Sequence, residues 1–117
     1  FYNNFNLTKD FLLNHGINNK KLILVDADEK DDIDNKFDLV ISLLSMGYHY
    51  PISQYLDFLK KNTHSETVFI FDIANEYSKL NDISKLFQKI EVIKESSEIR
   101  HNYVRICCEG IVDLKSL

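Results

Sequence analysis

Residues 37–44 read Phe-Asp-Leu-Val-Ile-Ser-Leu-Leu, and this stretch decides the fold that the sequence predicts. Its nearly continuous apolar run is typical of a strand that is buried on both faces, as in a parallel sheet. Residues 22–25 (Leu-Ile-Leu-Val) and 67–73 (Thr-Val-Phe-Ile-Phe-Asp-Ile) show the same pattern. Apolar residues recur at helical spacing in three segments outside these strands, at 6–16, 53–61 and 81–87.

The end of the chain predicts two more strands, residues 89–95 and 102–108, joined by a polar loop at 96–101. No helix separates these strands, so we expect an antiparallel hairpin. Alternating strands and helices that close with a hairpin indicate a doubly wound α/β sheet with an antiparallel edge. We therefore expect a mostly parallel sheet, in a single domain over residues 1–117 or the C-terminal portion of a larger one.

Composition excludes several classes of protein. The 117 residues carry a net charge of -4 and no basic run, which argues against direct binding of nucleic acid. No apolar stretch approaches the roughly 18 residues of a membrane helix, and no leader pattern is visible. The two cysteines, Cys107 and Cys108, are neighbours in the sequence, so they cannot close a loop with a disulfide. We expect both thiols to be buried and inert, which suits a reducing compartment, the cytoplasm. No pair of histidines has metal-ligand spacing, and we expect no metal site.

The carboxyl ends of parallel strands are where such sheets bind ligands, and here they lie at 26–28, 42–50 and 72–76. An acidic residue at these ends accepts a hydrogen bond from a ligand or instead caps a helix or turn, and the sequence leaves both open. The loop at 45–51 also offers His49 as a general base, with Tyr48 and Tyr50 as stacking partners. The alternative is that these rings pack the loop onto the sheet. His15, near the end of the first predicted helix, is expected either to cap it or to make a favourable contact with the helix dipole.

Known phosphate-binding and nucleophile motifs are absent from the sequence. There is no G-x-S-x-G, no Walker A loop and no G-x-G-x-x-G, which argues against enzymes that cradle a phosphate in such a loop. Residues 22–29 and 37–41 look like the acidic-pocket and phosphoacceptor strands of response-regulator receivers. Too few residues separate the two strands, and Leu43 stands where the acceptor Asp would be, so a receiver-like signalling domain stays a distant alternative.

The stronger resemblance is to the later part of class I S-adenosylmethionine-dependent methyltransferases. Asp26-Ala27 at a strand end, the acidic segment 28–36 and then Phe-Asp-Leu-Val-Ile-Ser at 37–42 resemble that family's pattern. The helix, the strand with Asp72 near its end and the closing hairpin also fit. The resemblance implies a Rossmann-like methyltransferase-type sheet, a cofactor, S-adenosylmethionine, and a small-molecule or sugar-like acceptor.

The resemblance also implies roles for individual residues. Asp26 would bind the adenine amino group, and Ala27 would approach the ring through its backbone. Three residues would line the methionine part of the cofactor: Ser42, Leu43 and Leu44. In the loop, Tyr48 and Tyr50 would contact the acceptor, and His49 would be the catalytic base for a hydroxyl acceptor.

The chain departs from the family at its N-terminal side. The family's Gly-rich turn and the acidic strand end that holds the ribose are absent, and their strands would lie between 22–25 and 37–44 in the sheet. We therefore expect an incomplete sheet, completed by a preceding segment of this or another chain or by a homo-oligomer, or else rearranged. Alone, the chain is expected to be inactive and to bind the cofactor poorly or not at all. The alternative function is a non-catalytic, methyltransferase-like module that binds another protein through its sheet edge or its tyrosine-rich loop.

Overall fold

The computed structural model describes residues 5–18, 22 and 36–112 of the 117, and the chain divides into two units, Phe1–Asp32 and Ile33–Leu117. In the first unit, helix α1 (Phe5–Asn14) confirms the helix predicted at 6–16. Gly16 has a φ of 91° and ends the helix, with its backbone N donating to the carbonyl of Leu13 at 3.2 Å. The strand predicted at 22–25 lies, apart from Leu22, outside the described residues.

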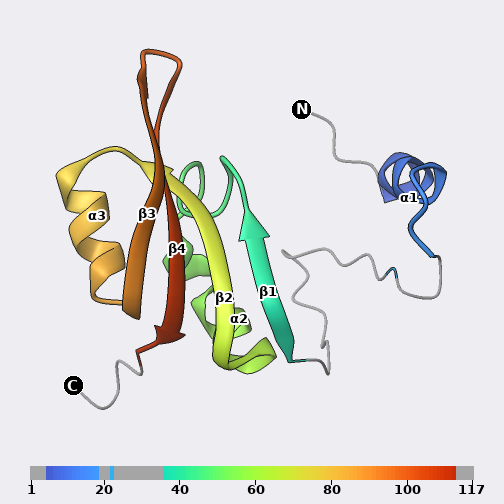
Figure 1. The fold of residues 1–117 in the computed structure, drawn as a ribbon, viewed down its shortest axis with the longest axis horizontal. Helices are drawn as coiled ribbons and strands as arrows, with labels where there is room; N and C mark the ends of the chain where they lie inside the picture. The colour runs from blue at the N-terminus through green and yellow to red at the C-terminus, as the bar shows by residue number, and fades with distance from the viewer. Residues whose placement is uncertain (1–4, 19–21, 23–35, 113–117) are drawn as a thin grey trace. The chain divides into compact units, whose positions relative to one another are not determined.

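The second unit contains an open mixed sheet of four strands in the order β1-β2-β4-β3 (Figure 1). Strand β1 (Phe37–Ser42) pairs in parallel with β2 (Thr63–Ala74), and β4 (His101–Ile111) pairs antiparallel with both β2 and β3 (Phe87–Glu98). The fold is therefore α/β, as predicted. Over the described residues the sheet is mixed: β1, β2 and β3 run in the same direction, but β4 is antiparallel and lies between β2 and β3, so only one of the three strand pairs is parallel.

The C-terminal hairpin is present but longer than predicted. The polar residues at 96–98 continue β3 and pair with Tyr103, Asn102 and His101, so the predicted loop reduces to a turn at Ile99 and Arg100. In Figure 1 the turn projects beyond the rest of the sheet. The polar composition of this segment suggested a loop, but backbone pairing in a hairpin does not require apolar side chains.

The helices differ in detail from their predicted positions. The segment predicted as one helix at 53–61 is a short 3-10 helix, η2 (Ile52–Gln54), followed by α2 (Leu56–Asn62). Helix α3 (Tyr77–Ser84) begins earlier than the predicted 81–87, and Phe87 instead starts β3, paired with Ile111.

One face of the sheet, the covered face, packs against α2 and α3. Phe69, Phe71 and Ile73 of β2 alternate toward this face and are almost fully buried. The rings of Phe69, Phe71 and Phe87 lie 5.2 to 5.9 Å apart between centroids. The other buried members of this core come from the neighbouring elements: Ile52, Leu59, Ile83, Val104, Ile106 and Cys108.

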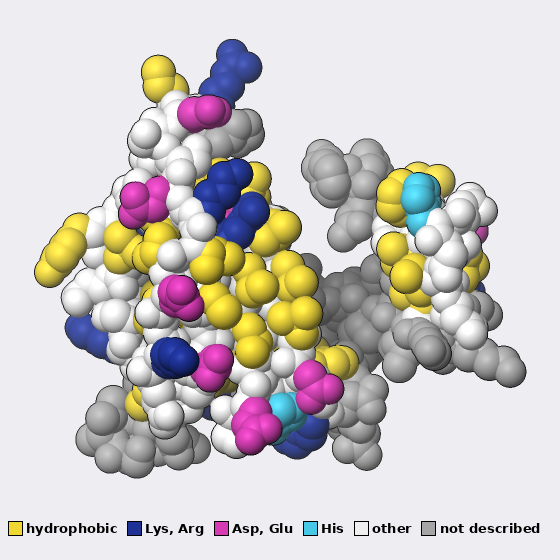
Figure 2. Space-filling view, viewed as in Figure 1, with side chains coloured by type: hydrophobic (Ala, Val, Ile, Leu, Met, Phe, Trp, Pro, Cys, Tyr) yellow, Lys and Arg dark blue, Asp and Glu magenta, His cyan; other side chains and the backbone are white. Residues whose placement is uncertain are grey.

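The opposite face, the open face, carries the alternate residues of the same strands. Leu39 pairs with Val68, and Ile41 pairs with Ile70, which in turn faces Cys107. The exposed fractions of Leu39 and Ile41 are 53% and 55%. Figure 2 shows hydrophobic side chains gathered over β1, β2 and β4 on this face.

The prediction that residues 37–44 form a strand buried on both faces is therefore wrong. Strand β1 ends at Ser42 and is an edge strand of the described sheet, and its open face is uncovered in the described part of the chain. The prediction that both cysteines are buried holds for Cys108, which lies on the covered face, whereas Cys107 lies on the other side and is only partly buried. Among the described helices, none is long and apolar enough to cross a membrane.

Candidate functional site

The candidate site lies at the carboxyl ends of the parallel strands β1 and β2, where the loop after Ser42 meets Asp72. Asp72 is fully buried. Its carboxylate accepts hydrogen bonds from Arg105 Nε at 2.7 Å, from Arg105 Nη2 at 3.0 Å and from the backbone N of Leu44 at 3.0 Å. Asp72 and Arg105 face each other directly in the β2–β4 register. The sequence allowed this acid either to bind a ligand or to cap a helix or turn, and the structure shows it capping the turn at Leu44.

The start of the loop is held tightly by these contacts. Leu44 has a φ of 50°, a left-handed conformation that is costly for a residue with a side chain, and its hydrogen bond to Asp72 fixes it there. Ser42 Oγ accepts a hydrogen bond from the backbone N of Met46 at 2.9 Å. The structure thus brings Ser42, Leu43 and Leu44 together at the end of β1, and Leu43 leaves 48% of its surface exposed.

The rest of the loop is a closed turn. The backbone N atoms of Tyr48 and His49 donate to the carbonyl of Ser45 at 2.9 and 2.8 Å, and Gly47 N donates to the carbonyl of Tyr50 at 2.7 Å. Gly47 has a φ of 94°, which favours glycine. The rings of Tyr48 and His49 form an edge contact with centroids 4.8 Å apart, and the side chains of His49 and Tyr50 are exposed. The three residues predicted to face an acceptor therefore share one turn.

Arg105 belongs to a cationic and aromatic group that the sequence reasoning missed. Its guanidinium lies 5.4 Å from the ring centroid of Tyr103, and Lys94 Nζ lies 5.8 Å from the same centroid. The hydrogen bonds to Asp72 raise the pKa of Arg105 above its ordinary value. An open hollow of about 530 Å³ runs from Leu44 along the hairpin past Lys94 and Tyr103. The sequence could have indicated this group, because alternation along the strand predicted at 102–108 places Tyr103 and Arg105 on the same face.

The remaining observations concern residues outside the loop at 45–51. Asp26 and Ala27, the predicted adenine contacts, lie outside the described residues. His15 lies at the end of α1, where its Nδ1 is 2.7 Å from the carbonyl oxygen of Phe11, and this confirms the expected capping contact. His64 Nε2 pairs with Asp38 Oδ1 at 2.7 Å. Over the described ranges, no three His, Cys, Asp or Glu side chains are arranged to hold a metal ion.

No protein-family model matches the chain, and no curated protein matches it. The function is therefore argued from the residues and their arrangement.

Proposed function

We propose that the chain is the C-terminal part of a class I S-adenosylmethionine-dependent methyltransferase domain that acts on a small-molecule or sugar-like acceptor once its sheet is completed beside β1. The observation that carries the proposal is the strand order β1-β2-β4-β3, with a terminal antiparallel hairpin attached to a parallel pair. A closing hairpin of this kind is what distinguishes the resembled family from ordinary dinucleotide-binding folds.

The residues at the end of β1 suit one part of the cofactor. Leu43 exposes apolar surface there, and the backbone at Leu44 is held in place by a buried carboxylate, so the surface is preformed. The hydroxyl oxygen of Ser42 accepts a hydrogen bond from the backbone N of Met46 and so holds the loop. Ser42 would therefore contribute to the cofactor site through its position at the end of the strand. These features support a role for Ser42, Leu43 and Leu44 along the methionine part, with Asp26 and Ala27 at the adenine.

The loop residues would act on the acceptor. S-adenosylmethionine would supply an activated methyl group on a positively charged sulfur. Tyr48 and Tyr50 would orient the acceptor and exclude water, because in-line displacement depends mainly on alignment. His49 would take the proton of a hydroxyl acceptor at a ring nitrogen. The edge contact with Tyr48 restricts the orientation of this imidazole.

The open face and the free edge of β1 support the view that this sheet is completed by further structure. Leu39 and Ile41 each expose about half of their surface, and both lie on the strand at the edge of the described sheet. An apolar edge strand is a site of pairing with further chain, whether a preceding segment or a second copy. The same observation favours one alternative, a non-catalytic module that binds a partner protein by strand addition at β1.

The test is an NMR titration of the 117-residue chain with S-adenosylhomocysteine, together with its mass in solution. We expect weak binding, with a Kd on the order of 1 mM or above, because the proposal requires further structure beside β1 to complete the cofactor site. Amide shifts are expected at Ser42–Leu44 and in the following loop. Leu43→Glu should abolish them, while Leu39→Glu, the same change at an equally exposed position nearer the start of β1, should not.

Each result points to one reading. Localised shifts that only Leu43→Glu removes support the methyltransferase proposal. A stable monomer that shows no shifts supports the binding module instead. Micromolar binding by a monomer would show that the site is complete as it stands, and the proposed incompleteness would be wrong.

A further inference from the structure

A second pocket lies on the covered side between η2 and α3, and it shares Gly47 with the loop of the candidate site. It encloses about 350 Å³. Its inner surface is formed by Ile52, Ile73 and Ile83, whose exposed fractions are 9%, 1% and 4%. Ligand pockets of proteins start at about this volume and are lined mainly by apolar side chains, so the pocket has room for a small, largely apolar molecule.

The walls of this pocket are fixed in advance. On one side, Gly47 is held by its hydrogen bond to the carbonyl of Tyr50, and its Cα packs so closely that an added Cβ would lie 3.2 Å from Ile73 Cγ2. On the other side, Ile83 belongs to the hydrophobic core. A ligand would therefore enter a preformed cavity, which reduces the entropy lost on binding.

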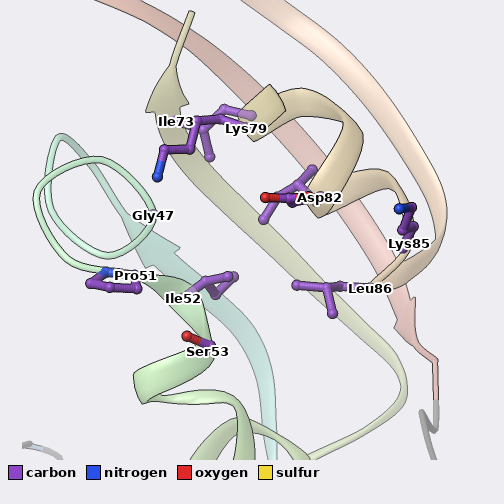
Figure 3. Close-up of a pocket in the computed structure, with 10 residues that line it drawn as sticks. Gly47, Pro51, Ile52, Ser53, Ile73, Lys79, Asp82, Lys85 and Leu86 are labelled. Atoms are coloured by element: carbon purple, nitrogen blue, oxygen red, sulfur yellow. The ribbon is translucent and has the colours of Figure 1, made fainter. Parts of the chain in front are cut away.

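Two opposite charges stand at the mouth of the pocket. Lys79 and Asp82 lie three residues apart on α3, so they share one side of the helix. Figure 3 shows the Lys79 amine reaching toward the Gly47 loop and the Asp82 carboxylate directed toward the middle of the pocket. Within residues 36–112, no ion pair forms between Lys79 and Asp82. Lys85 adds a second cation at the rim.

From this arrangement we infer that the pocket binds a free α-amino acid with an aliphatic side chain. The ammonium group of such a ligand pairs with Asp82, its carboxylate pairs with Lys79, and its side chain lies against the three isoleucines. A simple fatty acid would pair with Lys79 but leave Asp82 without a cation, and a simple amine would pair with Asp82 but leave Lys79 unpaired. The inference concerns binding alone and stands independently of methyl transfer.

The experiment is an NMR titration of the full chain with L-leucine and with two probes that each lack one charge, 4-methylpentanoate and 3-methylbutylamine. Leucine is expected to shift the signals of Ile52, Ile73 and Ile83 and to bind more tightly than either probe. Lys79→Met and Asp82→Asn should each weaken leucine binding about two- to fivefold, the range of an exposed ion pair. Both side chains are exposed, so neither change threatens folding.

Pairing each variant with the matching probe tests the assignment of charges. In Asp82→Asn, leucine and 4-methylpentanoate should bind equally; in Lys79→Met, leucine and 3-methylbutylamine should do so. Lys60→Met on α2, away from the pocket, is the control and should leave leucine binding unchanged. The inference is overturned if leucine causes no shifts at about 10 mM, or if 4-methylpentanoate binds the unchanged chain as tightly as leucine. Because no S-adenosylhomocysteine is present, failure here leaves the methyltransferase proposal untouched.

Discussion

The ion pair between Asp72 and Arg105 makes the stability of the sheet depend on a charge that is hidden from water. Asp72 is fully buried, and two of the three hydrogen bonds that it accepts come from Arg105. Arg105→Met removes both bonds and the compensating charge while it keeps an unbranched chain in place of the aliphatic part of the arginine. The carboxylate is then left with the backbone N of Leu44 alone.

The expected loss follows from the burial of Asp72. Leaving a buried charge without its partner costs about 3–5 kcal/mol, which is at least about a fifth of the roughly 5–15 kcal/mol that stabilises a typical domain. In the double variant Asp72→Leu/Arg105→Met no charge is stranded. The main remaining cost is the part-buried N–H of Leu44, which loses its acceptor, at most about 1–3 kcal/mol. The double variant should therefore be more stable than the single one.

Urea unfolding of the 117-residue chain at pH 7, followed by circular dichroism, measures both differences. We expect the order wild type, double variant, single variant, from most to least stable. A single variant within about 1 kcal/mol of the wild type would show that Asp72 is solvated when its partner is removed. A double variant less stable than the single one would show that the pair stabilises the sheet beyond satisfying its own burial.

Three further changes test other parts of the structure. Burial raises the pKa of Cys108 to about 12, so only about one Cys108 thiol in ten thousand is ionised at pH 8. Iodoacetamide should therefore label Cys107 alone in the native chain and both cysteines in urea, as measured by peptide mass mapping. Gly47→Ala should lower the free energy of unfolding by about 1–2 kcal/mol, because the residue has a φ of 94° and its Cβ would meet Ile73 at 3.2 Å; an unchanged urea midpoint would contradict this conformation. Ile41→Lys, at a side chain 55% exposed, should change stability by no more than about 1 kcal/mol and reduce any self-association seen by light scattering; a large loss of stability would mean that the open face is covered.

The sequence predicted the positions of the strands better than their surroundings. The apolar runs at 37–42 and 67–73 did become strands, because such runs bury well in a sheet. The same runs could not reveal that one face of β1 is exposed, since burial depends on what packs above it. The polar residues at 96–98 gave no sign of strand structure, because their pairing is set by the neighbouring strand. Boundaries moved for the same reason at Phe87, which periodicity assigned to a helix.

The sequence predicted where in the sheet the candidate site lies, but not the contacts within it. Strand ends pointed to residues 42–50 and to Asp72, and the structure brings both together. The partner of Asp72, Arg105, lies 33 residues away, and no local pattern connects two residues across antiparallel strands. Once the register is known, the ion pair follows, because the two residues face each other directly. Because both carboxylate oxygens of Asp72 accept hydrogen bonds within the protein, Asp72 holds the start of the loop in place instead of binding a ligand.

The handedness of the parallel pair limits what can complete the sheet. The connection from β1 through α2 to β2 places its helix on the covered face, where Leu59 joins the core. Parallel crossovers are right-handed, so a strand added beyond β1 that runs directly into it would place its helix on the covered face as well. A helix over the open face, as the proposal implies, can come only from a crossover that progresses away from β2. A single added strand would therefore satisfy the edge of β1 and leave Leu39 and Ile41 exposed, whereas a segment with at least one outward crossover would cover both. Restored affinity for S-adenosylhomocysteine is expected only with the second kind of complement.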